Sequence, residues 1–423
     1  MIGKYLYQLF IYLYPRVAKL ISPVSRKAGL WYKGRENIFE KIAEKIGNDD
    51  SPKVWFHASS LGEFEQGRTL IESFKTNHPT VKIVLTFFSP SGYEQQKNYS
   101  GADYIFYMPM DHPKNAERFY ALVKPACLFL IKYEYWYNYL AIAHQNKIPV
   151  FLVSGIFRED FSFFQWYGKW YQQMLFFINH FFLQDENSAS LLKSIGLLNY
   201  TVAGDTRFDR VIEVAKQKKL FPEVEAFCKN HETIIAGSTW HEDEKELRHF
   251  ASTHPEMRFV IAPHDISGER IDQCMRIFDQ AVLYSDYLSL YHSKKELPTG
   301  VNVLIINNIG MLKHIYKYGK VCMVGGGFRG DGIHNILEAA VYYKPVLFGP
   351  EHDKSLEALE LIKLGGAFDV RGALELEEEL MQLMHHPKVY EKACMIAGDY
   401  VKEKAGATQE ILRYIQEKRL FTN

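Results

Sequence analysis

The sequence predicts an α/β protein made of two doubly wound parallel sheets. Short, almost wholly apolar segments alternate along most of the chain with stretches long enough to form a helix. Strands that are apolar on both faces are typical of parallel sheets covered by helices on both sides. The alternation pauses at residues 204–219, where charged residues become frequent, and then resumes. A chain of 423 residues is expected to form two or three domains, and this single pause favours two.

Each half of the chain contains a series of segments that we predict to be strands. We place the N-terminal domain at residues 36–212 and the C-terminal domain at residues 213–423, whose last helix is a candidate to return to the N-terminal domain. Two such domains facing each other across a cleft bring the carboxyl ends of both sheets to one shared site. The predicted strands are 54–58, 82–88, 104–108, 127–131, 149–154 and 180–184, then 232–238, 258–263, 281–285, 302–306, 320–324 and 345–349.

The composition is that of an ordinary globular protein without a dominant charge. Fifty basic and fifty acidic residues cancel, so no overall field favours nucleic acid as a partner. The five cysteines are far apart and lie mostly in apolar runs. We expect them to be reduced core residues, because their number is odd and their spacing fits no metal site.

The first 35 residues combine aromatic and aliphatic side chains with seven Lys or Arg and no Asp or Glu. Lys4, Arg16 and Lys19 interrupt the apolar run, which leaves no clean stretch of the ~20 residues needed to cross a bilayer. The segment also lacks the cleavage site of a secretory signal. Its pattern is typical of a helix that lies on an anionic membrane surface. The alternative is a helix packed on the protein's own core.

A glycine-rich stretch in the second half is a candidate phosphate site. The strand at 320–324 is followed by five glycines within residues 325–332, then by a helix-like segment at 334–343 and the strand at 345–349. Glycines let the backbone approach a ligand and leave N–H groups for anionic oxygens, to which a helix N-terminus adds its positive end. The alternative is a turn in which the glycines serve backbone geometry alone. The spacing matches neither the Rossmann dinucleotide motif nor the P-loop.

Two acidic residues follow predicted strands of the first half. Glu63 stands in HASSLGE, on the first turn of a predicted helix, where the helix dipole favours an ionised carboxylate and suits a general base. Its alternative role is that of an ordinary helix-start residue. Glu134 lies in YEYWYN, just after the strand at 127–131. Its alternative is an exposed loop carboxylate.

Polar residues also follow strands of the second half. Ser238 and Thr239 are candidates to cap the next helix or to contact a phosphate. Pro263 and His264 end the strand at 258–263, and His264 either contacts a base or ribose or closes a turn.

Between the two halves, VAGDTRFD places Arg207 where it can face the predicted site. A guanidinium there binds a carboxylate or phosphate with two N–H groups. The alternative is an ion pair with Asp205 or Asp209.

The motifs resemble, in their order along the chain, those of the 3-deoxy-D-manno-octulosonic acid (Kdo) transferases of lipopolysaccharide assembly. The resemblance covers nearly the whole chain, including the basic and aromatic start, and is most specific at SLGE and at HNILEAA with KPVLFGP. It implies the GT-B glycosyltransferase architecture, CMP-Kdo as donor, and a lipid A precursor as acceptor at the cytoplasmic face of the inner membrane. The motifs are HASSLGE, YEYWYN, VAGDTRFD, AGSTWHEDE, IAPH and GGGFRGDGIHNILEAAVYYKPVLFGP.

The resemblance also implies roles for individual residues. Glu63 matches the proton acceptor, which takes the proton of the attacking sugar hydroxyl. Glu134 and Arg207 match positions that stabilise the transition state. Glu338 suits the ribose hydroxyls, because a carboxylate accepts from both. The residues implied to hold the donor are Pro263, His264, Ile309, Gly310, Met311, Gly326, Gly327, Asn335, Ile336, Leu337 and Glu338.

The implied reaction needs no cofactor. CMP leaves as a phosphate monoester, so fixed N–H dipoles at the phosphate help more than a strong acid. No D-x-D motif or suitable His cluster occurs, and we therefore predict metal-independent transfer with inversion at the anomeric carbon. Arg207 is a candidate to bind the carboxylate that Kdo carries beside the reacting carbon.

The chain departs from the family's pattern at several positions. Arg207 stands where the family commonly has Lys, His264 where it has Arg, and Gly310-Met311 where it has Gly-Glu. A tyrosine beside Glu134 replaces a threonine, and GIFR replaces an ARLS-like stretch. We expect backbone contacts to survive these changes, while donor affinity and acceptor choice change.

Two other functions are compatible with parts of the same pattern. Another GT-B enzyme, a UDP-sugar transferase or a UDP-N-acetylglucosamine 2-epimerase, shares the glycine loop and the ribose-binding glutamate. A non-enzymatic membrane-bound scaffold needs neither acid of the first half. The choice of CMP or UDP separates the two kinds of enzyme, and loss of Glu63 separates an enzyme from a scaffold.

Overall fold

The computed structural model describes residues 2–330 and 332–419 and divides the chain into two compact units. Unit 1 comprises the chain up to Arg210 together with the part from Ala405 onwards, and unit 2 is Val211–Lys404. The division falls within α10 (Thr206–Lys216), and the last helix, α20 (Ala407–Glu417), belongs to unit 1. Asp331 of the glycine-rich stretch and residues 420–423 of the predicted C-terminal domain lie outside the described residues.

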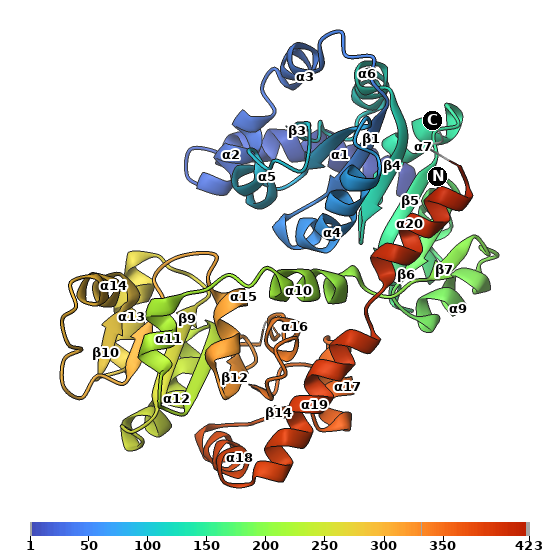
Figure 1. Ribbon diagram of the computed structural model, residues 1–423. Helices are drawn as coiled ribbons and strands as arrows, with labels where there is room; N and C mark the ends of the chain where they lie inside the picture. Colours follow the sequence, from blue (N-terminus) through green and yellow to red (C-terminus); the bar gives the residue numbers. More distant parts are fainter. Residues whose placement is uncertain (1, 331, 420–423) are drawn as a thin grey trace. The chain divides into compact units, whose positions relative to one another are not determined.

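Unit 1 is built around a seven-stranded parallel sheet (Figure 1). The strands lie in the order β3-β2-β1-β4-β5-β6-β7. Every residue of β1 is buried, as expected for a central strand covered on both faces. The strands are β1 (Lys53–Ala58), β2 (Lys82–Phe87), β3 (Tyr104–Tyr107), β4 (Pro125–Ile131), β5 (Val150–Gly155), β6 (His180–Leu183) and β7 (Tyr200–Val202).

Helices cover both faces of this sheet, and alternate residues of β1 serve the two sides. Phe56 packs with Phe64 of α4 and Ile411 of α20 on one face. Trp55 belongs to the core on the other face, to which α3, α6, α7, α8 and α9 contribute. The helices are α1 (Ile2–Ile21), α2 (Arg26–Gly34), α3 (Ile38–Ile46), α4 (Leu61–Asn77), α5 (Pro90–Gln96), α6 (Pro113–Val123), α7 (Tyr137–Gln145), η1 (Ser162–Phe164), α8 (Lys169–Phe176) and α9 (Glu186–Ser194).

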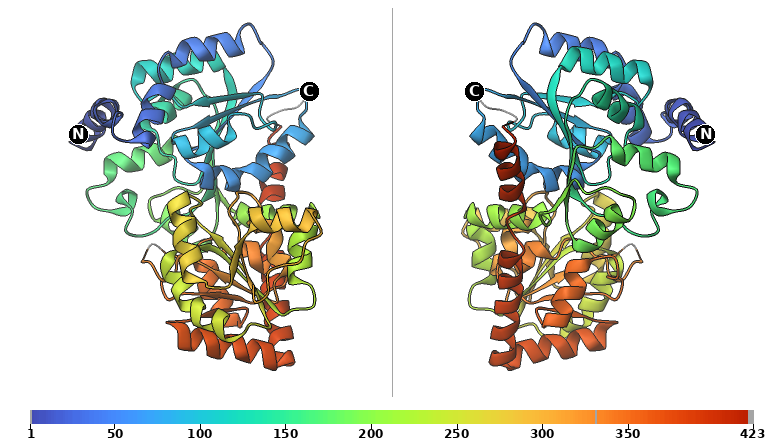
Figure 2. Two further views of the ribbon diagram at one scale, coloured as in Figure 1. Left: turned by 90° about the vertical axis from the view of Figure 1, so that its left-hand side faces the viewer. Right: turned by 90° about the vertical axis from the view of Figure 1, so that its right-hand side faces the viewer.

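Helix α1 packs on unit 1 with one side and exposes apolar residues on the other, at the outer edge of the unit in both views of Figure 2. Ile11 and Ala18 are buried in a small core with Trp31 and Met110. Packing on the protein's own core is thus observed for one side of the helix. No helix among the described residues is long and apolar enough to cross a membrane. The exposed apolar residues are Tyr5, Leu6, Leu9, Phe10, Tyr12, Leu13, Val17, Leu20 and Ile21.

Arg35, just after α2, ties the N-terminal helices to the carboxyl ends of two strands. Its guanidinium donates to the backbone oxygens of Phe88 at 2.7 Å and Met108 at 2.9 Å, which follow β2 and β3. It also lies against the ring of Trp31. Burial lowers the pKa of Arg35 to about 9. The first two helices are therefore anchored at the edge of the sheet from which the loops after the strands emerge.

Unit 2 repeats the architecture with a second seven-stranded parallel sheet, in the order β10-β11-β9-β8-β12-β13-β14 (Figure 1). Its strands are β8 (Thr233–Thr239), β9 (Arg258–Pro263), β10 (Ala281–Leu283), β11 (Val303–Ile305), β12 (Val321–Val324), β13 (Val346–Phe348) and β14 (Ala367–Asp369). Its helices are α11 (Pro222–Cys228), α12 (His241–Thr253), α13 (Gly268–Ile277), α14 (Tyr284–His292), α15 (Leu312–Ile315), η2 (Tyr316–Tyr318), α16 (Leu337–Ala340), α17 (Leu356–Leu364), α18 (Ala373–His385) and α19 (Pro387–Glu403).

The structure corrects the sequence prediction at three elements. The strands β7 and β14 were not predicted, and both are three-residue strands at sheet edges. The helix predicted at residues 334–343 is a single turn, α16, and Tyr343 has a positive φ of 58°. A helix this short aligns fewer peptide dipoles than the predicted helix would.

Candidate active site

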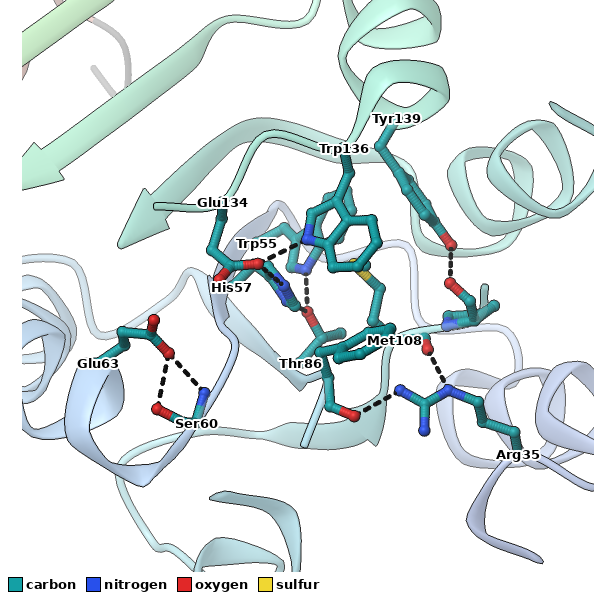
Figure 3. Close-up of polar contacts among 12 residues, drawn as sticks. Arg35, Trp55, His57, Ser60, Glu63, Thr86, Met108, Glu134, Trp136 and Tyr139 are labelled. Atoms are coloured by element: carbon teal, nitrogen blue, oxygen red, sulfur yellow. Dashed lines mark hydrogen bonds and ion pairs between the residues drawn. The ribbon is translucent and has the colours of Figure 1, made fainter. Parts of the chain in front are cut away.

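The first cluster of functional side chains lies at the carboxyl edge of the sheet in unit 1 (Figure 3). β2 and β4 flank β1 on opposite sides, so the chain direction across the sheet reverses between β1 and β4. Open α/β sheets bind ligands at such a switch point, outside the carboxyl ends of the strands. Glu63 lies on α4, which follows β1, and Glu134 lies in the loop that follows β4. The structure thus brings the two predicted acids to one place.

Glu63 stands in the first turn of α4 and forms a capping box with Ser60. Its Oε2 accepts from the Ser60 N–H at 2.7 Å and from the Ser60 hydroxyl at 2.8 Å. Both bonds go to one oxygen, so no hydrogen bond within the described residues occupies Oε1. The Glu63 side chain therefore caps the helix through Oε2, while Oε1 accepts no hydrogen bond from the described residues.

Glu134 is buried, with 4% of its surface exposed, and is not the exposed loop carboxylate that was the alternative. Its Oε2 lies 3.0 Å from His57 Nε2 and accepts from the indole N–H of Trp136 at 2.6 Å. Isolated buried carboxylates are strongly unfavourable, and partners of this kind are what make one tolerable. Trp136 follows Glu134 closely in the chain, whereas His57 comes from β1.

The two acids act on each other electrostatically. Burial, followed by the charge of Glu134, raises the pKa of Glu63, and this rise outweighs the opposing hydrogen bonds from Ser60 and the effect of His57. A carboxylate whose pKa is raised toward neutrality accepts a proton more readily than an ordinary glutamate does. The site therefore holds one carboxylate fixed by N–H donors and a second that is suited to take up a proton.

Arg207 lies in the first turn of α10, near these acids. Its Nε donates to Asp205 Oδ2 at 2.7 Å, so of the two ion pairs considered from the sequence the one with Asp205 forms. Asp209 instead accepts from backbone N–H groups at the start of α20. Burial raises the pKa of Tyr133, the residue before Glu134, and the charges of Arg207, Asp205 and Glu63 also contribute to the pKa of this hydroxyl. Arg207 thus belongs to the same region of unit 1 as Glu63.

The residues predicted to hold a nucleotide all lie in unit 2, in loops that follow β9, β11 and β12 at the carboxyl edge of its sheet. The switch point of this sheet lies between β8 and β12. Pro263 is the last residue of β9 and is buried, and His264 is exposed beside it. The ring of His264 stacks on His334, with centroids 4.3 Å apart, and lies 4.9 Å from the ring of Trp240. Partial burial of the ring lowers the pKa of His264, although the residue as a whole is exposed.

The glycine loop after β12 is held by contacts within the chain. The Gly326 N–H donates to both carboxylate oxygens of Asp243, at 2.9 and 3.1 Å. A Cβ on Gly327 would lie 2.6 Å from the backbone of Gly349. These glycines allow close packing of two loops, which is the alternative role considered from the sequence. Among the groups predicted to face a phosphate, the Gly326 N–H already has an acceptor.

The other donor-site residues fall into two short stretches. Ile309 is 77% exposed, Gly310 has a positive φ of 93°, and Met311 is buried next to α15. Asn335 Oδ1 accepts from the Leu337 N–H at 3.2 Å. The side chains of Ile336 and Leu337 are fully buried, so these two residues present only backbone groups to a ligand. Glu338 is half-buried on α16.

Sequence reasoning missed several polar residues of these sites. His57 stands within an apolar strand, and its partners are 29 and 77 residues away. Asp243 was part of a charged helix start, yet it is fully buried and its Oδ2 also accepts from the Trp240 N–H at 2.7 Å. Thr239, considered as a cap or phosphate ligand, donates to Glu244 instead. A histidine at the carboxyl end of an otherwise apolar strand was the one signal available for His57.

Comparisons with known proteins agree with this arrangement. A family model described as 3-Deoxy-D-manno-octulosonic-acid transferase (kdotransferase) matches residues 36–210, the segment that carries Glu63 and Glu134. The 3-deoxy-D-manno-octulosonic acid transferase of Aquifex aeolicus is 26% identical over 361 residues, covering 83% of this chain and 92% of that protein. The protein of the same name from Bordetella pertussis is 24% identical over 415 residues, covering 93% of each chain. The chain is similar to Kdo transferases along most of its length, and residues 36–210 match the model of that family.

Solved structures show which fold the chain has. A UDP-GlcNAc 2-epimerase from Neisseria meningitidis has a TM-score of 0.60 at 17% identity, covering 86% of this chain and all of that one. A glycosyltransferase from Rickettsia africae has a TM-score of 0.56 at 12% identity, covering 88% of this chain. At these identities the likeness concerns the fold alone. The predicted GT-B fold with two parallel sheets is confirmed, while the roles of individual site residues stay predictions.

Proposed function

We propose that the chain transfers Kdo from CMP-Kdo to a sugar hydroxyl of a lipid A precursor, with inversion at the anomeric carbon and release of CMP. The match of residues 36–210 to the Kdo transferase model and the similarity of the chain to a Kdo transferase support the donor and the reaction class. The observation that carries the proposal is the pair of carboxylates at the switch point of unit 1. Glu134 is held by two neighbouring side chains, and Glu63 beside it has a raised pKa.

In the proposed step the acceptor oxygen forms a bond to the anomeric carbon of Kdo while the bond from that carbon to the phosphate oxygen of CMP breaks. The electron pair of the broken bond stays on the phosphate. The hydroxyl proton passes to Glu63 Oε1, because Ser60 occupies Oε2. Glu134, as an anion, stabilises the positive charge that develops on the sugar ring in an oxocarbenium-like transition state.

We assign the donor nucleotide to unit 2. The loops after β9, β11 and β12 supply the candidate contacts, and the stacked rings of His264 and His334 offer a flat surface beside Trp240. Ile336 and Leu337 contribute backbone groups only, since their side chains are buried. The remaining candidates are Pro263, Ile309, Gly310, Met311, Gly326, Gly327, Asn335 and Glu338.

The carboxylate of Kdo is assigned to Arg207. A guanidinium offers several N–H donors in one plane and is suited to a substrate carboxylate, and its Nε bond to Asp205 positions the Arg207 side chain. No metal or other cofactor is part of the proposed reaction.

We further propose that the protein works at the cytoplasmic face of the inner membrane, with α1 lying on the lipid surface. The exposed apolar side of α1 and the basic residues Lys4, Arg16 and Lys19 support this proposal. The hydroxyl of Tyr7 on α1 donates to buried Asp111 and accepts from the Tyr137 N–H. The membrane helix is thus attached near the loop that carries Glu134, which suits an acceptor that is itself a lipid.

Nucleotide-dependent unfolding tests the donor. A ligand that binds only the folded state stabilises it by about 2.7 kcal/mol at 100 times its Kd. We expect CMP to raise the Tm of the pure protein, and UDP at the same concentration to leave it unchanged. Protection by UDP and none by CMP would replace the proposal with a UDP-sugar enzyme, the class to which the structurally similar epimerase belongs. Protection by neither nucleotide would favour the non-enzymatic scaffold.

A further inference from the structure

A chain of hydrogen bonds runs through the interior of unit 1 and ends on Glu134 (Figure 3). The indole N–H of Trp55 donates to Thr86 Oγ1 at 2.7 Å. Thr86 Oγ1 lies 2.7 Å from His57 Nδ1, and His57 Nε2 lies 3.0 Å from Glu134 Oε2. Trp55, His57 and Thr86 are each at most 1% exposed. The proposed reaction assigns no role to these three residues, although they are buried and directly connected to its site.

The chemistry of the donors fixes where the protons lie. An indole nitrogen donates and never accepts, so Thr86 Oγ1 must be the acceptor of the bond from Trp55. Thr86 Oγ1 has one other partner among the described residues, His57 Nδ1, and we place the hydroxyl proton of Thr86 on this bond, so that Nδ1 is the acceptor. A neutral imidazole with an accepting Nδ1 carries its proton on Nε2. His57 therefore donates that proton to Glu134 Oε2.

As a result, one carboxylate oxygen of Glu134 accepts two hydrogen bonds. Oε2 receives the N–H of His57 and the N–H of Trp136, and an oxygen that accepts two N–H groups is best served by the ionised acid. No hydrogen bond within the described residues occupies Oε1 of Glu134. The chain of hydrogen bonds thus holds the charge and leaves one oxygen for another partner.

We propose that His57 and Thr86 are positioning residues of the transfer reaction, which hold Glu134 as an anion with Oε1 free for the reacting sugar. The inference rests on the proposed function, since it is there that the anion of Glu134 acts on the sugar. His57 and Thr86 act through Glu134 and touch no substrate themselves.

Other titratable groups face Glu134 and belong in the same account. Glu63 on α4 is the second acid of the site, and Glu134 contributes to the rise of its pKa. Tyr135, next to Glu134 in the loop, is buried in a way that raises its pKa far above the working range, so it stays neutral. Burial raises the pKa of Tyr133, to which the charges of Arg158, Arg207 and Asp205 also contribute. Within this set, His57 is the titratable group that is hydrogen-bonded to Glu134.

Matched substitutions at His57 test the proposal by kinetics. His57→Leu removes the donor, and His57→Gln keeps an N–H at a similar reach. We expect His57→Leu to lower kcat at neutral pH about 10- to 100-fold, the loss expected for one hydrogen bond to a charged group, with KM for CMP-Kdo little changed. Activity should recover as the pH rises, because the unsupported acid then ionises, so the acid limb of kcat/KM moves to higher pH. His57→Gln should restore most of the rate and the wild-type limb.

Thr86 gives a second matched pair. Thr86→Ser keeps the hydroxyl and should behave like the wild type. Thr86→Val removes it, leaves His57 Nδ1 without its proton donor, and should shift the acid limb in the same direction as His57→Leu by a smaller amount. A pH profile that is unchanged in both His57→Leu and Thr86→Val would overturn the inference, as would a loss of rate in His57→Leu that His57→Gln shares in full.

A measurement without substrate separates the inference from the proposed function. In His57→Leu the carboxylate of Glu134 lacks its donor from His57, so raising the pH should lower the Tm of this variant relative to that of the double variant with Glu134→Gln. Between wild type and Glu134→Gln no such divergence is expected. Equal pH dependence in all four proteins would refute the inference. Absence of Kdo transfer by the wild type refutes the proposed function alone, and the thermal comparison then still decides whether His57 holds the charge.

Discussion

Replacing Glu63 by Gln separates the two roles of this side chain, helix capping and proton acceptance. Its Oε2 accepts from the N–H and hydroxyl of Ser60, and the amide oxygen of Gln accepts the same two bonds, as Gln does in other capping boxes. Exchanging a charged acceptor for a neutral one weakens each bond, but it also removes the buried charge and its repulsion by Glu134, which outweigh these bonds, so we expect no loss of stability at neutral pH. The helix start should therefore survive the substitution.

The effect on the reaction should be far larger. A positioned general base contributes about 10²- to 10⁴-fold, which corresponds to about 3–5 kcal/mol of the barrier. The amide of Gln cannot take a proton from the attacking hydroxyl, so kcat/KM for CMP-Kdo should fall by this factor. The rate is measured by CMP release in the presence of acceptor, and folding by the Tm of the same preparation.

Two further variants complete the comparison. Glu63→Ala should lose the same rate and in addition about 1 kcal/mol of stability, because the capping bonds disappear. Ser60→Ala removes only the hydroxyl bond and should keep the proton acceptor. The reasoning is refuted if Glu63→Gln folds normally and keeps more than a tenth of the wild-type rate.

The remaining predictions concern pH, the membrane and the glycine loop. Burial and then the neighbouring carboxylate of Glu134 raise the pKa of Glu63 above 4.5, and the ionised form is the active base. Activity should therefore fall on acidification at a higher pH than it would with an ordinary glutamate. Glu134→Gln should move this acid limb of the pH–activity profile to lower pH. Leu9→Asp with Leu13→Asp, both on exposed positions, should weaken binding to vesicles of anionic phospholipid more than tenfold at unchanged Tm, and equal binding would argue against a membrane role of α1. Asp243→Ala should destabilise the protein by about 2–4 kcal/mol in urea, because it leaves the buried N–H of Gly326 and the partly buried N–H of Trp240 without their acceptor, and a neutral result would contradict the packing role of the loop.

Much of the fold follows from local sequence pattern. The predicted strands of both sheets form because apolar segments of this length can be buried on both faces, and β1 shows this in full. The strands β7 and β14 escape such reasoning because three residues carry too little pattern. The segment at 334–343 has the apolar content of a helix, yet the chain leaves the helical conformation after Ala340 and reaches a positive φ at Tyr343. Tertiary packing overrides helix propensity there.

The candidate site likewise contains residues that were predicted from the sequence and residues that were not. Glu63 and Glu134 were predicted from their positions after strands, because parallel sheets gather the loops after neighbouring strands at one edge. The hydrogen-bond partners of Glu134 were not predicted. The bonds among Trp55, His57 and Thr86 depend on which strands are neighbours and on the face of the sheet to which each residue points. The bond between Asp243 and the Gly326 N–H joins residues 83 positions apart and has no local signal.

The central claim is tested most directly by the reaction itself. The pure protein is incubated with CMP-Kdo and a tetraacylated lipid A precursor, and the lipid products and free CMP are measured by mass spectrometry. The account predicts a lipid heavier by one or more Kdo units, with one CMP released for each unit, and product formation at least about 100-fold slower with Glu63→Gln under the same conditions. A donor and an acceptor that are both intact at the end of the incubation, with protein that is folded, would contradict it.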